Sequence, residues 1–320
     1  MCQEDSCAQP LLRPLRGSFE PHVTVVICTR NRPVFLRNCL QAIARLERAP
    51  DEVIVVDNTA GDINTEAVAL EFAARYIVEP TQGLSRARNR GLTECNSEII
   101  AYLDDDAVPD QRWLGLLLEP FADPDVAIVT GETISPESDA ANRSQEPTRS
   151  FSNKNPHWFE IACFGGMGIG AGMALRKAAC TGIKVFDERL GRGAPLHGAE
   201  EHHAFARLLS LGYRAVQVPA AFVVHPSIRR RSIEQEASCS IAYWLLLFFE
   251  FPDHRREVIL FLFRRLRHKP LPWSRDTPGL GSMITSGWRM RIRAGLAGIL
   301  LYLRARKMSA KPRIAQRQRN

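Results

Sequence analysis

The sequence predicts an α/β protein with a mostly parallel sheet flanked by helices and a helical, basic C-terminal extension. Three observations support this prediction. Continuous β-branched runs such as residues 23–28 (VTVVIC) alternate with segments of helical periodicity. One apolar run ends in three consecutive carboxylates, Asp104 to Asp106. Residues 251–320 hold 17 Lys and Arg against 3 Asp and Glu, and residues 1–250 hold 25 against 32, so the positive charge lies in the C-terminal part.

Uninterrupted Val and Ile runs predict strands that are buried on both faces, and apolar residues three to four positions apart predict helices. In chain order these patterns indicate strand 23–28, helix 34–46, strand 53–56, helix 64–75, strand 76–78, helix 84–93, strand 98–103, helix 111–121 and strand 126–130. Residues 135–156 are rich in Ser, Pro and Asn and predict a flexible loop. Ligands of such βαβ sheets bind at the carboxyl ends of the strands, so we expect the functional site there.

Length and composition set the broad class. A chain of 320 residues has room for one α/β domain with an appendage, and its 45% hydrophobic and 24% charged residues exclude disorder and a polytopic membrane protein. The eight cysteines form no C-x-x-C pair, which argues against a zinc site or a disulfide framework and fits a reducing cytoplasm. Residues 1–20 contain no apolar stretch typical of a secretory signal, so we expect a cytoplasmic protein with a short N-terminal extension.

The segment YLDDDAVPD, residues 102–110, predicts a divalent-cation site. Its three carboxylates follow the apolar strand that ends at residue 103. Oxygen ligands suit Mg²⁺ or Mn²⁺, and such an ion commonly completes its coordination with substrate phosphates. A nucleotide diphosphate is therefore the expected ligand. The alternative is an acidic turn that caps the following helix.

A glycine-rich segment, CFGGMGIGAGMALRK, matches the letters G-x-G-x-x-A at Gly166, Gly168 and Ala171. A dinucleotide fingerprint follows the first strand of a βαβ unit, whereas the first strand here ends in Thr29-Arg30-Asn31-Arg32-Pro33 without glycine. We therefore interpret these glycines as part of a close-packed strand with substrate-facing backbone.

Five segments together resemble the successive motifs of family 2 glycosyltransferases, which have the Rossmann-like GT-A fold. They are, in order, VVICTRNRP, VIVVDN, GLSRARNRGL, IIAYLDDDAVP and GAEEHHAFARLLSLGY, and the resemblance covers residues 23–226. It implies a nucleotide-sugar-binding half at 21–134 and an acceptor-binding half at 157–232, separated by loop 135–156 and followed by a helical region at 233–320.

The resemblance also implies roles for individual residues. Thr29, Arg30 and Asp57 would contact the base and ribose of a nucleotide-diphosphate sugar, and Asp104 and Asp105 would continue this contact. Arg88 would reach the nucleotide or its diphosphate. Asp106 would bind Mn²⁺ or Mg²⁺, and His225, in FVVHP, is either a second metal or phosphate contact or a core histidine.

Transfer to a hydroxyl acceptor needs a carboxylate base, because a hydroxyl group is neutral at pH 7. Glu201 lies where the family usually has its catalytic Asp, and the longer side chain changes the reach of the carboxylate. The alternative for Glu200 and Glu201 is that both favour a helix N-terminus. We expect His202 and His203 on the helix surface or near the acceptor, and Trp158 either stacked on a sugar or in the core.

The acceptor and the type of transfer are predicted less specifically. Processive relatives carry Q-x-x-R-W after the catalytic helix, whereas this chain reads IRRRSIEQEAS, so a single-sugar, non-processive transfer is implied. We expect this transfer to invert the configuration of the sugar. A lipid-linked or cell-envelope glycan is one option for the acceptor. Nucleic acid is excluded as a partner, because no nucleic-acid-binding motif accompanies the pI near 9.1.

The apolar segments of the C-terminal region are too short to span a bilayer. Residues 241–249 are followed by Glu250, Pro252 and Asp253, and the basic residues around 258–266 and after Leu296, Ile299, Leu300 and Leu303 suit helices lying in an anionic membrane surface. Peripheral association with the inner face of the plasma membrane is one outcome. The alternative is a helical subdomain packed on the catalytic core.

Two other functions remain open on the sequence alone. Asp104, Asp105 and Asp106 with Ala107 and Val108 also satisfy the D-x-D-x-V pattern of HAD-like phosphatases, although that fold normally has its nucleophile near the first strand, and six predicted elements precede this strand. The Glu at position 201 permits a membrane-peripheral scaffold that kept the fold and lost turnover.

Overall fold

The computed structural model describes residues 20–137, 146–226, 232–266 and 288–309. The predicted N-terminal extension, except for its last residue, lies outside the described residues. The same is true of the middle of the predicted loop and of residues 267–287, which include part of the basic C-terminal charge. Everything below concerns the described ranges.

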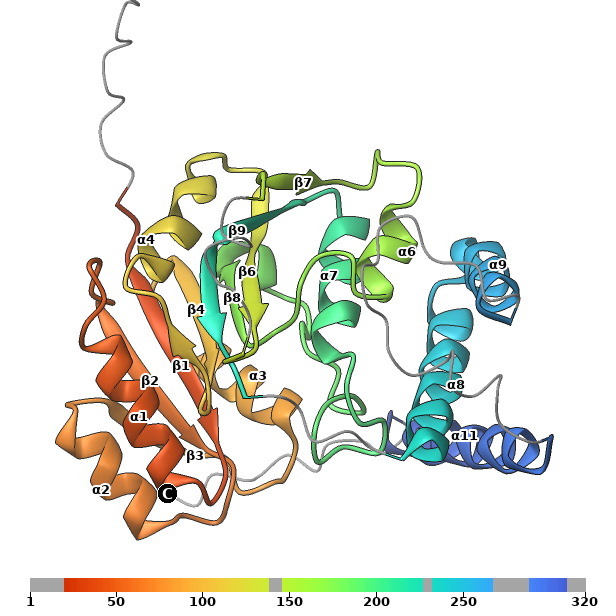
Figure 1. Ribbon diagram of the computed structural model, residues 1–320, viewed down its shortest axis with the longest axis horizontal. Helices are drawn as coiled ribbons and strands as arrows, with labels where there is room; N and C mark the ends of the chain where they lie inside the picture. The colour runs from red at the N-terminus through yellow and green to blue at the C-terminus, as the bar shows by residue number, and fades with distance from the viewer. Residues whose placement is uncertain (1–19, 138–145, 227–231, 267–287, 310–320) are drawn as a thin grey trace, which may run out of the picture.

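One mixed sheet forms the centre of the molecule (Figure 1). Its strand order is β3 (Arg75–Val78), β2 (Glu52–Asp57), β1 (Val23–Thr29), β4 (Ile99–Asp104), β8 (Gly172–Arg176), β6 (Val126–Ile134), β9 (Arg214–Val224) and β5 (Val108–Pro109), with β7 (Arg149–Phe151) also paired to β9. The first four strands are parallel, and β8 runs antiparallel to both β4 and β6. The predicted α/β class with a mostly parallel sheet is confirmed.

Strand register brings the predicted site residues to one edge of the sheet. Thr29 pairs with Asp57 at the ends of β1 and β2, and Cys28 pairs with Asp104 at the ends of β1 and β4. Because parallel strands end at the same edge, the polar residues that follow them gather there. The β-branched residues of these strands are buried on both faces, as the uninterrupted apolar runs indicate.

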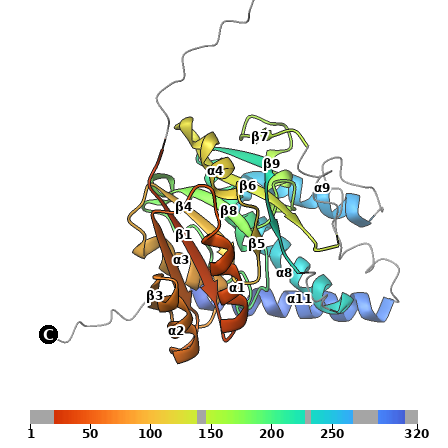
Figure 2. The same cartoon turned by 60° about the vertical axis from the view of Figure 1, so that its left-hand side comes forward.

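Helices cover both faces of the sheet. One apolar cluster joins one face to α1 (Pro33–Ile43), α2 (Ile63–Glu71) and α4 (Trp113–Leu118). A second cluster joins the other face to α3 (Leu84–Glu94), α6 (Trp158–Cys163) and α7 (Glu200–Ser210). Figure 2 shows α1 on the near side of the sheet and α8 behind it.

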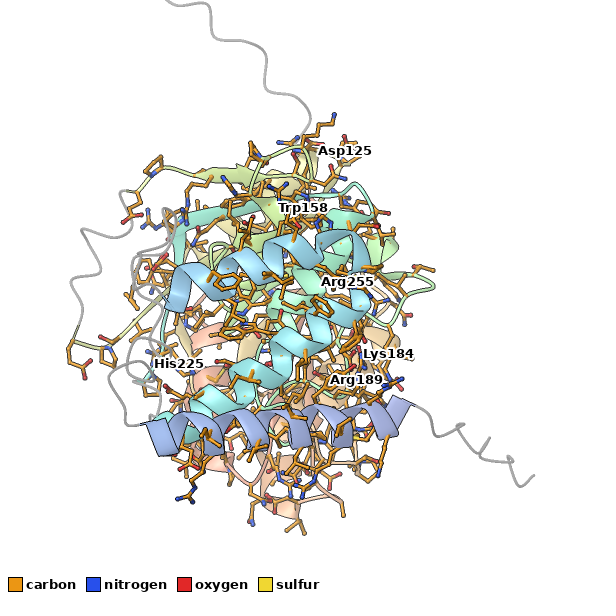
Figure 3. The ribbon with its side chains drawn as sticks, turned by 90° about the vertical axis from the view of Figure 1, so that its right-hand side faces the viewer. Asp125, Trp158, Lys184, Arg189, His225 and Arg255 are labelled. Atoms are coloured by element: carbon orange, nitrogen blue, oxygen red, sulfur yellow. The ribbon has the colours of Figure 1, made fainter. Side chains whose placement is uncertain are left out.

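The C-terminal helices form an outer layer beyond α6 and α7 (Figure 1). They are α8 (Ile233–Glu250), α9 (Arg255–Leu266) and α11 (Trp288–Ser309), and Figure 3 shows α8 crossing between the other two. Leu246 and Leu247 of α8 and Phe261 of α9 are buried in the same cluster as the sheet. For α8, the alternative of a helical subdomain packed on the catalytic core is therefore the correct one, because this helix is part of the core cluster.

Helix α11 is buried on one face only. Ala294, Tyr302 and Ala305 are buried, and a Cβ atom on Gly298 would lie 2.8 Å from Ile241 of α8, so the two helices approach closely there. The opposite face exposes five apolar side chains, from Ile292, Leu296, Ile299, Leu300 and Leu303. None of the described helices combines the length and the apolarity needed to cross a membrane.

Several predicted boundaries were wrong. Helix α1 ends at Ile43 instead of residue 46, and strand β6 continues to Ile134 instead of ending at residue 130. Helix α2 ends at Glu71 instead of residue 75, and Ala73 adopts a left-handed conformation (φ 53°) before β3. The helix predicted at 111–121 is α4 followed by a 3₁₀ turn at Glu119–Ala122, because Pro120 lacks the N–H that an α-helix would use. Strand β7 lies within the predicted loop.

Two glycines allow strands β6 and β8 to lie very close to residues of strand β9. A Cβ atom on Gly131 would lie 1.8 Å from the carbonyl oxygen of Ala221, and one on Gly172 would lie 2.8 Å from Val223 Cγ1. Only glycine permits these approaches. The interpretation of the glycine-rich segment as a close-packed strand holds at Gly172, the first residue of β8, but was wrong for Gly166 and Gly168, which lie before that strand.

Candidate active site

A cavity of about 440 Å³ opens at the carboxyl ends of β1 and β4. Eight of the nine predicted site residues line it: Thr29, Arg30, Arg88, Asp104, Asp105, Asp106, Glu201 and His225. They come from the ends of β1, β4 and β9 and from the helices α3 and α7. Asp57 is the predicted residue that does not line the cavity.

Asp104, Asp106 and His225 form a candidate metal site, because one ligand atom from each lies within 4.8 Å of the other two. His225 Nδ1 lies 2.8 Å from the carbonyl oxygen of Pro226, so Nδ1 carries the proton that is donated there. Nε2 faces the two carboxylates, 2.9 Å from Asp106 and 3.8 Å from Asp104. Two carboxylates and one imidazole fit Mn²⁺ or Mg²⁺ and leave positions for phosphate oxygens.

The charges of this cluster stabilise one another. Burial alone would raise the pKa of Asp106, but the contacts with His225 and Arg32 hold it well below the ordinary carboxyl value. Burial likewise opposes the charged form of His225, and the neighbouring Asp106 carboxylate outweighs it, so the pKa of His225 is raised. Asp106 is therefore anionic throughout the physiological range and suited to bind a cation.

Asp105, the middle acid, turns away from the metal site into the protein. Its two oxygens accept hydrogen bonds from Thr29 Oγ1 at 2.7 Å and from Arg32 Nη1 at 2.5 Å. Burial is the largest influence on this carboxyl, and it raises the pKa to about 6 in spite of both partners. Asp105 and Thr29 therefore connect the ends of β4 and β1, and their predicted contacts with a nucleotide stay predictions.

Arg32 and Asn58 are site residues that the sequence reasoning missed. Arg32 joins two of the three acids, since Nη2 also donates to Asp106 Oδ2 at 2.5 Å. Asn58 donates to the carbonyl oxygens of Glu79 and Thr81 and accepts a hydrogen bond from the backbone N–H of Gly83, so it fixes the turn before α3. Both residues stand next to predicted ones in the motifs TRNRP and VDN, which was the available signal.

Asp57 is fully buried beside the cavity. Its Oδ2 accepts hydrogen bonds from the Thr59 hydroxyl, the backbone N–H of Asp62 and the Tyr76 hydroxyl, the last at 2.6 Å. Burial and this carboxylate raise the pKa of Tyr76 to about 12. Oδ1 has no hydrogen-bond partner among the described residues and is the atom that a ribose or base donor would need.

Arg88 is buried beneath the cavity and connects three elements. It donates to Glu200 Oε1 at 3.1 Å, to Asp104 Oδ1 at 3.3 Å and to the carbonyl oxygen of Gly170 at 3.1 Å. A Cβ atom on Gly170 would lie 3.0 Å from the guanidinium, so glycine is needed beside it. These protein contacts occupy much of the guanidinium, and the predicted contact with a diphosphate stays a prediction.

Glu200 and Glu201 begin α7 and have different protonation behaviour. Burial and the charge of Glu201 raise the pKa of Glu200 to about 7, and Arg88 opposes them. Burial also acts to raise the pKa of Glu201, but His202 and Arg88 bring it below the ordinary value. Glu201 lines the cavity, and its lowered pKa keeps it ionised at neutral pH. Backbone N–H groups of Glu201 and Gly170 stabilise the carboxylate, and its buried Oε2 atom has no hydrogen-bond partner among the described residues. This is the state that a general base requires.

His203 is not on the helix surface as predicted. It is 1% exposed, and its Nε2 lies 3.0 Å from Glu250 Oε2 at the end of α8. Arg189 (Figure 3) pairs with Glu250 and with Asp187. Asp187, His203 and Glu250 also lie close enough together to bind a metal ion, but the guanidinium of Arg189 already neutralises both carboxylates.

Trp158 lies against the core, which was one of its two predicted positions. It does not line the cavity, and its ring packs edge-on against His254 with centroids 5.0 Å apart.

The chain has recognisable relatives. The family model described as Glycosyl transferase family 2 matches residues 24–182. The Pre-mycofactocin glycosyltransferase of Mycobacterium tuberculosis is 28% identical over 218 residues, which cover 67% of this chain and 44% of that protein. The succinoglycan biosynthesis protein ExoM of Rhizobium meliloti is 28% identical over 219 residues, covering 66% of this chain and 69% of ExoM. The chain thus spans less than half the length of the mycobacterial relative.

Solved structures share the fold. A mannosyltransferase from Pyrobaculum calidifontis, in complex with GDP-Man and Mn²⁺, superimposes with a TM-score of 0.54 at 18% identity, over 89% of this chain and 88% of the other. At this identity the likeness establishes the fold. It covers the C-terminal layer as well as the part that the family model matches.

Proposed function

The chain belongs to glycosyl transferase family 2 through residues 24–182, and from this membership we propose that it is a metal-dependent, inverting and non-processive glycosyltransferase. It would move one sugar from a nucleotide-diphosphate donor to a hydroxyl acceptor. The observation that carries the proposal is one cavity lined both by Asp104, Asp106 and His225 and by Glu201, whose Oε2 atom has no hydrogen-bond partner among the described residues.

The donor would bind with its diphosphate at the candidate metal site. Mn²⁺ or Mg²⁺ held by Asp104, Asp106 and His225 would neutralise the negative charge that develops on the departing diphosphate. Arg32 holds the carboxylates of Asp105 and Asp106 in place from the protein side. The likeness to the mannosyltransferase that was solved with GDP-Man and Mn²⁺ supports this donor class.

Glu201 would be the base. Its lowered pKa keeps it ionised at neutral pH, so it can accept the proton of the acceptor hydroxyl. The acceptor oxygen then forms a bond to the anomeric carbon while the bond from that carbon to the diphosphate oxygen breaks. One displacement on the face opposite the leaving group inverts the configuration. The Arg88–Glu200 pair holds the first turn of α7, which carries Glu201.

The family match argues against the HAD-like phosphatase, because the matched residues 24–182 include the DDDAV segment. The scaffold alternative differs from the enzyme in turnover, so it is resolved by a transfer assay.

The first experiment is calorimetry with a panel of nucleoside diphosphates and their sugars, with Mn²⁺ and with EDTA. We expect one nucleotide to bind in a Mn²⁺-dependent manner, and Asp106→Asn to abolish that dependence, since the amide lacks the anionic charge. Asp125→Asn is the matched control, because Asp125 is exposed at the start of β6, away from the cavity (Figure 3). Unchanged Mn²⁺-dependent affinity in Asp106→Asn would refute the assigned metal role.

A further inference from the structure

A second cavity, of about 1160 Å³, adjoins the first. The two share part of their lining, including Arg32, Asp106 and His225. The far wall of the second cavity comes from the C-terminal layer, with Ser238 and Cys239 of α8 and Leu300 of α11. A molecule in this second cavity can therefore reach the candidate active site directly.

The lining of the second cavity is apolar at one part and cationic at another. Phe35 of α1 and Leu300 of α11 both line it, and these large apolar side chains are 45% and 55% exposed. Arg192 and Arg304 supply the positive charge. Neither guanidinium pairs with a carboxylate among the described residues. The two acids in the lining already have partners, since Glu234 lies 3.4 Å from Arg293 and Asp106 pairs with Arg32.

The apolar part continues out of the cavity. Leu300 belongs to the exposed apolar face of α11, together with Leu296, Ile299 and Leu303. Figure 3 shows α11 as the outermost helix along one side of the C-terminal layer. A hydrocarbon chain that leaves the cavity beside Leu300 would thus run along this face, where its contact with water is reduced.

We infer that the second cavity binds the acceptor, and that the acceptor is an anionic amphiphile. Its hydroxyl-bearing head lies at the shared wall near Asp106 and His225, its anionic group lies beside Arg192 and Arg304, and its apolar chain follows α11. This inference rests on the proposed function and names the substrate class of the same site. It assigns acceptor binding to α8 and α11, outside residues 24–182.

The test uses the full chain and dodecyl phosphate, below its micelle concentration, as the probe in calorimetry. We expect dodecyl phosphate to bind at least about tenfold more tightly than inorganic phosphate, because the chain adds apolar contact. We expect it to bind more tightly than neutral dodecyl maltoside as well. Equal affinity for inorganic phosphate would contradict the apolar part of the inference, and equal affinity for the maltoside would contradict the anionic part.

Matched variants locate the probe. Leu300→Gln should weaken dodecyl phosphate binding about fivefold, whereas Leu260→Gln on α9, which is also exposed but neither lines the cavity nor belongs to the apolar face of α11, should leave it unchanged. Arg304→Gln should weaken it and Arg306→Gln should not, since Arg306 is exposed on α11 outside the lining. Equal losses of dodecyl phosphate affinity within both pairs would indicate that the probe adsorbs non-specifically to exposed side chains, and would overturn the inference.

Nucleotide binding separates failure of the acceptor inference from failure of the proposed glycosyltransferase function. Mn²⁺-dependent nucleotide affinity should be the same in all four variants, which also confirms that they fold. A wild-type chain that binds nucleotide but no dodecyl phosphate would overturn the acceptor inference alone. Failure to bind any nucleotide would instead count against the proposed function.

Discussion

Replacing Arg88 by Met should destabilise the fold strongly, and more at high pH than at low pH. The Arg88 side chain is 3% exposed and that of Glu200 is 6% exposed, so the substitution leaves a buried carboxylate without its cation. Breaking a buried ion pair from one side typically costs about 3–5 kcal/mol. We expect a loss of this size in the free energy of unfolding at pH 8.

The pH dependence follows from the protonation of Glu200. Its pKa is already raised to about 7, and loss of Arg88 raises it further. A carboxyl whose folded-state pKa lies above its unfolded value binds protons preferentially in the folded state, so stability increases as pH falls between those two values. Between pH 8 and pH 6 the penalty of Arg88→Met should shrink by up to about 1.4 kcal/mol, at about 1.36 kcal/mol per pH unit, because wild-type Glu200, with a pKa of about 7, itself takes up a proton over the lower half of this interval.

Urea unfolding at pH 8 and pH 6 measures both quantities. The matched control is Arg90→Met on the same helix, because Arg90 is 44% exposed and pairs with Glu94 at 2.9 Å, an exposed pair worth about 0.5 kcal/mol or less. Adding Glu200→Gln to Arg88→Met should recover part of the loss, since no buried charge is then left at that position. A loss below about 1 kcal/mol at pH 8, or one that does not change with pH, would refute the reasoning.

Three further predictions concern the base and the packing of the sheet. Glu201→Gln should lower transfer about 10²-fold or more with donor affinity unchanged, as kinetics and calorimetry would show; full activity would exclude Glu201 as the base. In the wild type, the acidic limb of the kcat profile should lie below pH 4.5, because the pKa of Glu201 is lowered, and a limb near pH 7 would assign the base to Glu200. Gly131→Ala should cost at least about 1–3 kcal/mol in urea unfolding, because its Cβ would meet the Ala221 carbonyl oxygen, whereas Gly115→Ala in α4 should be neutral or stabilising; equal effects would contradict the packing argument.

The sequence predicted the centre of the sheet well because its strands are buried on both faces. Strands β1, β2 and β4 read as uninterrupted β-branched runs, and the residues after them must meet at one edge. This argument, together with the family resemblance that supplied Arg88 and Glu201 on helices α3 and α7, located eight of nine candidate residues at the cavity. It could not say which way consecutive side chains point, so the inward turn of Asp105 and the bridging role of Arg32 emerged only from the structure.

The rest of the fold depends on contacts distant in sequence. Nothing local in residues 172–176 shows that β8 runs antiparallel between β4 and β6. The C-terminal helices were ambiguous for a different reason, because an apolar stripe looks the same whether it packs on protein or on lipid. The structure resolves this ambiguity for α8, which is buried in the core, whereas α11 still presents an apolar face to solvent.

The contact between His203 and Glu250 bears on how such enzymes can be divided or recombined. It connects the helix that carries Glu201 to the end of α8, 47 residues further along the chain. A fragment that stops before α8 would leave His203 buried without this partner and would uncover the apolar sides of α6 and α7. The stretch that identifies the family is therefore shorter than the unit that folds. On the acceptor site inferred above, exchanging acceptor specificity between relatives would require transplanting α7 together with the C-terminal helices.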